Sequence, residues 1–203
     1  MAVMNNLSFD EFDLKLKEFA KENKVPIIFD EGLSFLESII KIKKPSRILE
    51  IGTAIGYSAI RMAKASNAII DTIERNIDMY NLAINNIKEA KLDNRINVIF
   101  KDAFIAYDDI KDNKYDLIFI DAAKAQYHKF FDLFTNLLNE SGVVVCDNML
   151  FHGLVESESN DYSRSVRGLI RKLKEFHEYL LNNSEFDSSI YDIGDGMAIS
   201  IKK

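Results

Sequence analysis

The sequence is poor in cysteine and proline and contains no tryptophan. Its 203 residues include one cysteine and two prolines. Cys146 therefore has no partner for a disulfide within the chain. Its place inside an apolar run indicates a small buried side chain, and burial makes its thiol unreactive. With so few prolines, little interrupts helices and strands along the chain.

The sequence also lacks a long apolar run and an excess of positive charge. No segment approaches about 18 uncharged apolar residues, and the N-terminus has no basic region followed by an apolar block. The net charge of -6 and the pI of about 5.2 argue against a protein that binds nucleic acid over its whole surface, but leave room for a local basic patch. We expect a cytoplasmic protein without a membrane segment.

The hydrophobic content, 47% of 203 residues, suffices for one sizeable core. We therefore predict a single domain over residues 1–203. Five short apolar runs alternate with amphipathic segments, which is typical of a parallel sheet covered by helices on both faces. The predicted strands are 47–51, 68–74, 96–100, 115–121 and 142–147, and the predicted helices between them are 57–65, 78–90 and 126–138.

Both ends of the chain add to this α/β pattern. Ser8 and Glu11 form a capping-box pattern at the start of a helix over 8–22, and another helix follows Pro26. After a helix over 163–182, two strand-like runs flank the turn 194–196, which indicates a hairpin. We therefore expect a seven-stranded, mostly parallel sheet with a C-terminal antiparallel hairpin and extra N-terminal helices.

The first predicted strand leads into a turn with two glycines, in "ILEIGTAIGYS". Glycines there allow the backbone to approach a ligand at the edge where α/β proteins bind cofactors. The spacing G-x-x-x-G differs from the G-x-G-x-x-G of dinucleotide sites, which disfavours a nicotinamide dehydrogenase. Glu50 before the loop suits a positively charged ligand, and Glu74 ends the second strand where it can bind both hydroxyls of a ribose. Together the two acids and the glycine loop suggest S-adenosylmethionine. The alternatives are that the glycines only form a tight turn between strand and helix, and that Glu74 caps a helix.

Acids also follow three later strands. Asp102 stands where the amino group of an adenine needs an acceptor, and Asp121, Asp147 and Asn148 follow the fourth and fifth strands on the same edge of the sheet. Carboxylate and amide oxygens without cysteine or a well-placed histidine suit Mg²⁺, Mn²⁺ or Ca²⁺. The alternative is that both aspartates cap helices or form turns.

Lys124 follows the first of these acids by three residues. A lysine close to a cation and to a sulfonium can lose its proton and act as a base. Methyl transfer to oxygen needs such a base and a metal that acidifies the hydroxyl. The alternative is an ordinary solvated lysine.

At these residues the chain resembles the class I, metal-dependent O-methyltransferases related to catechol and caffeoyl-CoA methyltransferases, over about residues 25–203. "LEIGTAIGYS" is similar to the first cofactor motif, "TIER" to the ribose acid, "DAAKAQY" to the metal-and-base motif and "DNMLFHG" to the second metal motif. "VPIIFDEG" resembles the segment before the first motif. Ala125 stands where many relatives have glycine.

The resemblance implies a Rossmann-like methyltransferase fold, homodimers and a set of site residues. By position, the implied cofactor contacts are Ile28, Glu50, Gly52, Thr53, Ser58, Glu74, Asp102, Ala103 and Asp121. The implied metal ligands are Asp121, Asp147 and Asn148, and Lys124 is the implied base. His128 and His152 lie near the motifs but lack the spacing of metal ligands.

Within that family the chain is most similar to bacterial tRNA 5-hydroxyuridine methyltransferases, through "DAAKAQY", "DNMLFHGLV" and "SRSVRGLIRKLKEF". The 5-hydroxyl and 4-carbonyl of 5-hydroxyuridine can chelate one cation as a catechol does. A basic helix could bind tRNA phosphates, although it also fits an ordinary solvated surface; its residues are Arg164, Arg167, Arg171, Lys172 and Lys174. The rival hypotheses are a small catechol-like acceptor and a non-catalytic RNA-binding module.

Overall fold

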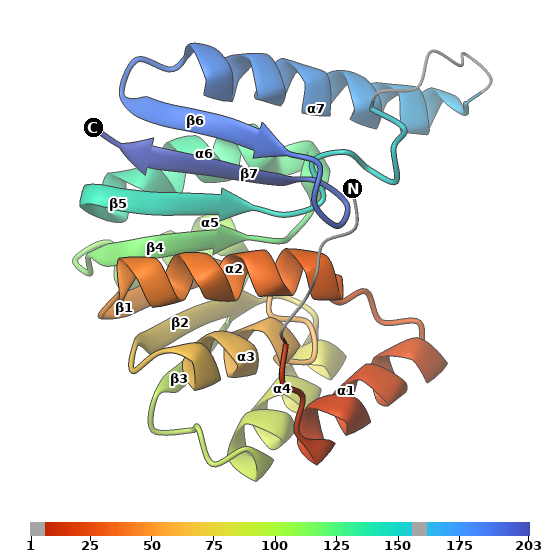
Figure 1. Ribbon diagram of the computed structural model, residues 1–203, viewed down its shortest axis with the longest axis vertical. Coiled ribbons are helices and arrows are strands. Elements are labelled where there is room, and N and C mark those ends of the chain that lie inside the picture. The colour runs from red at the N-terminus through yellow and green to blue at the C-terminus, as the bar shows by residue number, and fades with distance from the viewer. Residues whose placement is uncertain (1–6, 156–161) are drawn as a thin grey trace.

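The computed structural model describes residues 7–155 and 162–203 and has a seven-stranded sheet at its centre (Figure 1). The strands are β1 (Arg47–Ile51), β2 (Ile69–Glu74), β3 (Ile96–Phe100), β4 (Tyr115–Ile120), β5 (Leu138–Cys146), β6 (Phe186–Tyr191) and β7 (Met197–Lys202). Their order is β3-β2-β1-β4-β5-β7-β6, with β1 to β5 parallel and β7 antiparallel to both of its neighbours. The predicted fold class and the C-terminal hairpin are confirmed.

Helices cover both faces of the sheet, as the near-continuous apolar strands predict. They are α1 (Glu11–Glu22), α2 (Asp30–Lys43), α3 (Tyr57–Ala65), α4 (Ile77–Glu89), α5 (Ala103–Ile110), α6 (Tyr127–Phe134) and α7 (Arg164–Asn182). Side chains of α1 to α4 form one core with one face of the strands, and side chains of α5 to α7 form a second core with the other. In Figure 1, α2 and α3 lie in front of the sheet and α5 and α6 behind it.

The strand order changes direction between β1 and β4, which are neighbours in the sheet although two strands separate them in the chain. Loops that follow these two strands therefore diverge and leave an opening, the usual position of ligand sites in such sheets. The amide of Asp121 donates to the carbonyl of Ile51, and the amide of Asp147 donates to that of Ile120. The residues that follow β1, β4 and β5 thus meet at one edge.

Two local predictions are wrong, and one helix was not predicted. The N-terminal cap of α1 is Asp10, which forms a capping box with Asp13 instead of the Ser8–Glu11 pair. The helix expected over 126–138 is shorter, because 3₁₀ turns flank α6 and Leu138 already begins β5. The sequence reading also missed α5, whose eight residues are too few for a clear helical period.

Buried ion pairs join the two N-terminal helices to α3. Arg61 on α3 is 4% exposed, and it donates to Glu37 on α2 (2.6 and 2.9 Å) and to Asp13 on α1 (2.6 Å). Lys64 also pairs with Asp13, at 2.8 Å. Because α3 begins at the glycine loop, this network fixes α1 and α2 relative to that loop.

Replacing Arg61 with methionine is expected to lower the free energy of unfolding by about 3–5 kcal/mol, because two acids lose the partner that compensates their burial. Chemical denaturation measures the change. The matched control is Arg171→Met on α7, whose exposed pair with Glu175 should contribute less than about 1 kcal/mol. Equal effects of the two substitutions would show that the buried network does not hold the helices.

In the described parts of the chain, no helix combines the length and the apolar character needed to span a bilayer.

Candidate active site

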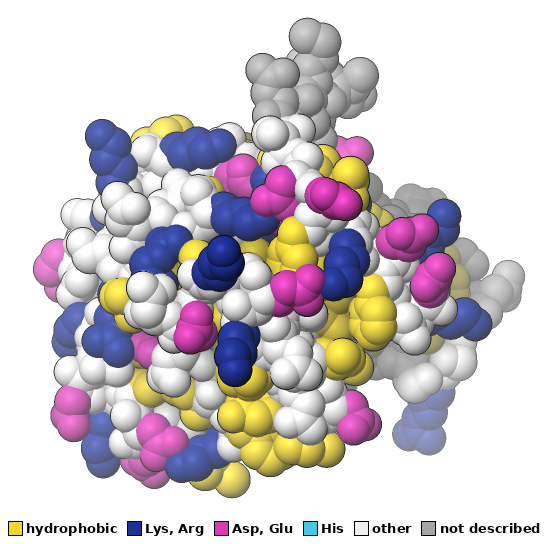
Figure 2. Space-filling model, turned by 90° about the horizontal axis from the view of Figure 1, so that it is seen from below, with side chains coloured by type: hydrophobic (Ala, Val, Ile, Leu, Met, Phe, Trp, Pro, Cys, Tyr) yellow, Lys and Arg dark blue, Asp and Glu magenta, His cyan; other side chains and the backbone are white. Residues whose placement is uncertain are grey.

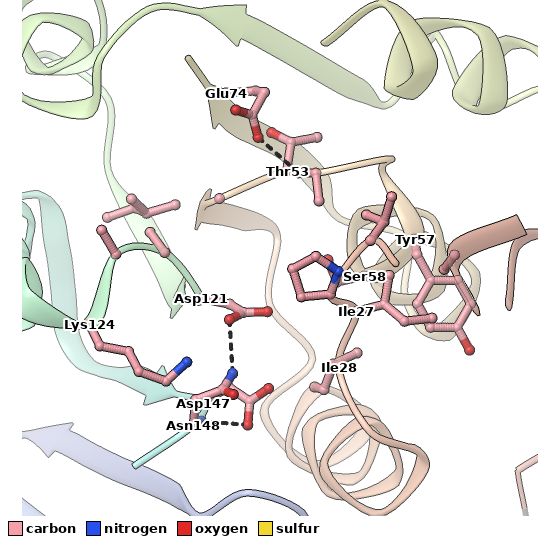
Figure 3. A pocket seen from close by; sticks show the side chains of 18 of the residues that line it. Ile27, Ile28, Thr53, Tyr57, Ser58, Glu74, Asp121, Lys124, Asp147 and Asn148 are labelled. Atoms are coloured by element: carbon pink, nitrogen blue, oxygen red, sulfur yellow. Dashed lines mark hydrogen bonds between the residues drawn. The ribbon is translucent and has the colours of Figure 1, made fainter. Parts of the chain in front are cut away.

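A cavity of about 1410 Å³ lies along the edge of the sheet where β1, β2, β4 and β5 end. Its lining includes residues that the sequence predicted for a cofactor and a metal: Ile28, Gly52, Thr53, Ser58, Glu74, Asp102, Ala103, Asp121, Lys124, Asp147 and Asn148. Figure 3 shows Glu74 at one end of the cavity and Asp121, Asp147 and Asn148 toward the other. Its volume exceeds the usual 300–1,000 Å³ of a single ligand site, so there is room for two reactants.

The loop after β1 needs glycine at its first position. Gly52 has φ of 104°, and a Cβ there would overlap the backbone carbonyl of Asp121. Its amide donates to the carbonyl of Ile73 on β2. The loop therefore lies directly against the end of β4, which brings the predicted cofactor loop next to the predicted metal ligand.

Replacing Gly52 with alanine is expected to weaken S-adenosylmethionine binding at least about tenfold and to destabilise the fold by more than 1 kcal/mol, because the backbone must move away from Asp121. Calorimetric titration and thermal unfolding measure the two effects. Gly168→Ala on α7 is the control, since a Cβ there meets no atom within 4 Å. An unchanged affinity for the cofactor in the Gly52 variant would contradict this role of the loop.

Glu50 lies behind the glycine loop and is not among the cavity-lining residues. It is fully buried, and its two carboxyl oxygens accept hydrogen bonds from Ser58 (2.5 Å) and Thr72 (2.6 Å). Burial raises the pKa of Glu50 to about 8, against the opposing effect of these two hydrogen bonds. Thr53, also buried, bonds the hydroxyl of Thr72. In this structure Glu50 fixes the shape of the loop from behind, and the hydroxyl of Ser58 is engaged by it.

Glu74 faces the cavity from the end of β2. One of its oxygens accepts the amide of Ala54 at 2.9 Å, and the other accepts the amides of Arg75 and Asn76. Asp102 also lines the cavity, caps α5 by accepting the amide of Phe104, and lies 3.7 Å from Arg75. These bonds hold both carboxylates in fixed positions at the ends of neighbouring strands.

The two later acids and the amide form a compact group. Asp121 directly follows β4, Asp147 directly follows β5, and the side-chain amide of Asn148 donates to Asp121 at 3.1 Å. Asp147 accepts the backbone amide of Asn148 at 2.7 Å, and the left-handed conformation of Asn148 (φ 60°) accompanies this tight turn. Tyr127 donates its hydroxyl to the carbonyl of Asp147 and so fixes the turn from α6.

The environment of these residues fits a hard cation. Burial raises the pKa of Asp121, opposed by the charge of Lys124, and burial together with the charge of Asp121 raises that of Asp147. Two carboxylates in one buried site repel each other unless a cation lies between them. The amide of Asn148 can offer its oxygen in place of its nitrogen by a rotation of the side chain. The three oxygens suit Mg²⁺, Mn²⁺ or Ca²⁺ and leave positions for a substrate.

Lys124 opens a 3₁₀ turn, Lys124–Gln126, that follows the end of β4. Its ammonium points toward Asp121, Asp147 and Asn148 in Figure 3 and lies 5.8 Å from the ring centre of Phe151. The side chain lines the cavity and is not an isolated surface charge. The structure therefore brings the acid and the lysine of "DAAKAQY" to one place.

The cavity also contains aromatic residues that sequence reasoning missed. Phe104 and Phe130 stack with their ring centres 5.0 Å apart and supply an apolar wall. Phe104 directly follows the predicted Asp102–Ala103 pair. Its position beside these implied cofactor contacts was the signal by which the sequence could have identified it. Phe130 carries no signal of its own in the sequence.

Other predicted candidates lie outside the cavity lining. The basic residues of α7 are exposed, and they are Arg164, Arg167, Arg171, Lys172 and Lys174. His128 on α6 lies 3.6 Å from Asp132 and packs against Tyr179. His152, in contrast, lines the cavity.

Comparisons with known proteins find matches over most of the chain. The model of a family described as O-methyltransferase matches residues 9–203. A flavonoid 3',5'-methyltransferase from Vitis vinifera is 30% identical over 86% of this chain and 77% of its own. A crystal structure from Staphylococcus aureus, named as a putative caffeoyl-CoA O-methyltransferase, is 38% identical with a TM-score of 0.91 and covers 96% of this chain and 93% of its own. A Bacillus cereus O-methyltransferase in complex with SAH shares the fold, with a TM-score of 0.83 at 24% identity over 98% of this chain and 93% of its own.

Proposed function

This chain belongs to the O-methyltransferase family, and from that premise we propose that it transfers the methyl group of S-adenosylmethionine to a hydroxyl that has a second oxygen beside it, with the help of a divalent metal ion. The observation that carries the proposal is the group formed by Asp121, Asp147 and Asn148, which opens into the same cavity as the glycine loop, with Lys124 turned toward it.

The residues divide into a cofactor part and a metal part. Glu74 has the position and the acceptor oxygens to bind the two hydroxyls of a ribose, and Gly52 lets the backbone approach the rest of the cofactor. Asp121, Asp147 and Asn148 would hold the cation, which when bound lowers the pKa of an oxygen ligand and orients it.

Lys124 is the proposed base for the acceptor hydroxyl. Lys124 would accept the proton of the acceptor hydroxyl, and the bound cofactor would supply its methyl group to that oxygen, with the electron pair of the S–CH₃ bond left on sulfur. Phe104 and Phe130 add an apolar wall to the same cavity. Holding the two reactants in line supplies much of the acceleration, because a well-oriented pair can gain about 7–11 kcal/mol.

The relatives' names support a small phenolic acceptor. One relative is named for a flavonoid, and the similar crystal structure is named for caffeoyl-CoA. A catechol-like molecule has two neighbouring oxygens that can chelate one cation. We therefore propose this acceptor class first on the evidence of the relatives.

The surface favours a second candidate, 5-hydroxyuridine at the wobble position of tRNA, which would become 5-methoxyuridine. The five exposed basic residues of α7 can contact phosphates. In Figure 1, the beginning of α7 lies toward the side on which the parallel strands end. Figure 2 shows the opposite end of the molecule, near α1 and α4, where positive and negative side chains are interspersed. The proposed phosphate-binding face is α7, on the evidence of its exposed basic residues.

An acceptor panel tests the proposal. The protein is incubated with labelled S-adenosylmethionine and Mg²⁺, and with 3,4-dihydroxybenzoate, caffeoyl-CoA or unmethylated tRNA that carries 5-hydroxyuridine. Mass spectrometry identifies the products. We expect O-methylation of at least one acceptor and its loss with EDTA. If only the small molecules are methylated, tRNA is excluded as the acceptor. If 5-methoxyuridine is the only product, the phenols are excluded.

The homodimer and the cytoplasmic location stay predictions of the resemblance and of the composition. Light scattering of the purified protein tests the first, with about twice the 23.3 kDa chain mass as the expected result.

A further inference from the structure

The loop that follows the metal group is bound to the hairpin turn between β6 and β7. The amide of Met149 donates to the carbonyl of Gly196 (3.0 Å), and the amide of Leu150 donates to that of Asp195 (2.8 Å). A Cβ on Gly196 would be only 2.6 Å from the side chain of Leu150, so the two backbones are in close contact. The hairpin turn therefore sets the position of the residues after Asn148.

His152 lies in this loop with a buried carboxylate behind it. Its backbone amide donates to one oxygen of Asp195, and its ring Nδ1 lies 3.5 Å from the other, Oδ2. Asp195 is 4% exposed, and its Oδ2 is a buried atom without a hydrogen-bond partner among the residues that the structure describes. The side chain of His152 is 65% exposed and lines the cavity.

The backbone at this point is also strained. Phe151 and His152 have φ of 49° and 56°, a conformation that residues with a side chain adopt at a cost of about 1–2 kcal/mol each. The contacts with the hairpin turn hold this conformation, which places the imidazole between Asp195 and the cavity.

A partner for Asp195 Oδ2 is available without any change of fold. A small rotation of the imidazole would let Nδ1–H donate to it, and a buried carboxylate oxygen gains from such a bond. In the neutral imidazole, a proton on Nδ1 leaves a lone pair on Nε2, which then accepts a hydrogen bond from the cavity side.

Resting on the function proposed above, we propose that His152, positioned by Asp195, binds the acceptor through Nε2 and selects an acceptor that has an N–H beside its metal-chelating oxygens. In such an acceptor the second oxygen is the carbonyl of an amide or imide. 5-Hydroxyuracil has this arrangement, because the N3–H is next to the 4-carbonyl, whereas a catechol has a C–H there. The pair thus favours the nucleoside over the phenol.

Steady-state methylation of two probes tests the proposal, an RNA hairpin that carries 5-hydroxyuridine and 3,4-dihydroxybenzoate. In His152→Ala and Asp195→Asn, we expect kcat/KM for the hairpin to fall at least about tenfold, mainly through KM. Methylation of 3,4-dihydroxybenzoate, where it occurs, and the affinity for S-adenosylmethionine should stay within about twofold. The unchanged cofactor affinity separates loss of acceptor binding from loss of folding.

The matched control is His128→Ala, because His128 also pairs with an aspartate, Asp132, but is not a lining residue of the cavity. It should leave both reactions unchanged. The proposal is overturned if the parent protein methylates only 3,4-dihydroxybenzoate, or if the His152 variant methylates the hairpin at the parent rate. Methylation of neither probe, and of no other acceptor in the panel above, would overturn the proposed function itself, and the inference with it.

Discussion

Replacing Asp147 with asparagine is expected to lower the rate of methyl transfer at least about 10³-fold, the largest effect predicted for this protein. The substitution keeps the shape of the side chain and removes one of the two carboxylates proposed to bind the cation. Several kcal/mol of transition-state stabilisation depend on such an ion, and each 1.36 kcal/mol is a factor of ten in rate. Initial rates with labelled cofactor at saturating Mg²⁺ give the change.

The same variant has a second expected result that does not depend on activity. In protein stripped of metal, Asp147→Asn removes a buried charge beside Asp121 and should raise the free energy of unfolding. Added Mg²⁺ should stabilise the parent protein and have little effect on the variant. Asp116→Asn, at the start of β4 and not among the cavity-lining residues, is the control. A variant that is still stabilised by Mg²⁺ and active would mean that the cation binds elsewhere.

The second large effect is expected from replacing Lys124 with methionine. We expect kcat to fall about 10²–10⁴-fold, which is the usual contribution of a general base. Affinity for the cofactor and stabilisation by Mg²⁺ should be unchanged, because neither depends on the proton of Lys124. Lys124→Arg should not restore the rate, since a guanidinium stays protonated in proteins. Pre-steady-state methyl transfer under single-turnover conditions isolates the chemical step.

Lys101→Met is the matched control, because Lys101 also lines the cavity but pairs with Asp109. Its kcat should stay within about threefold of the parent value. If Lys124→Arg instead retains most of the rate, the side chain supplies positive charge and does not take the proton.

The sequence predicted the sheet and the meeting of Asp121 with Asp147 for a simple physical reason. Apolar strands separated by helices must be parallel and buried, and the carboxyl ends of parallel strands lie at one edge. Residues directly after two neighbouring strands therefore have to be close. The same reasoning placed Glu74 beside the glycine loop.

Other features depend on contacts between distant parts of the chain. The sequence shows that Glu50 is an acid before the loop, but only the fold shows that Ser58 and Thr72 bond its carboxylate and that it does not line the cavity. His152 carries no metal-ligand spacing, and its partner Asp195 is 43 residues away in a hairpin turn. Sequence patterns do not reveal contacts between residues so far apart in the chain.

The most direct test of the central claim is methyl transfer by metal-stripped protein to the better acceptor of the panel, before and after addition of Mg²⁺. The claim is that one cation, held by Asp121, Asp147 and Asn148, brings two neighbouring oxygens of the acceptor into place. It predicts no product without metal, restored product with Mg²⁺, and no product from an analogue that lacks the second oxygen. Equal rates with and without EDTA, or equal rates for the analogue, would contradict it.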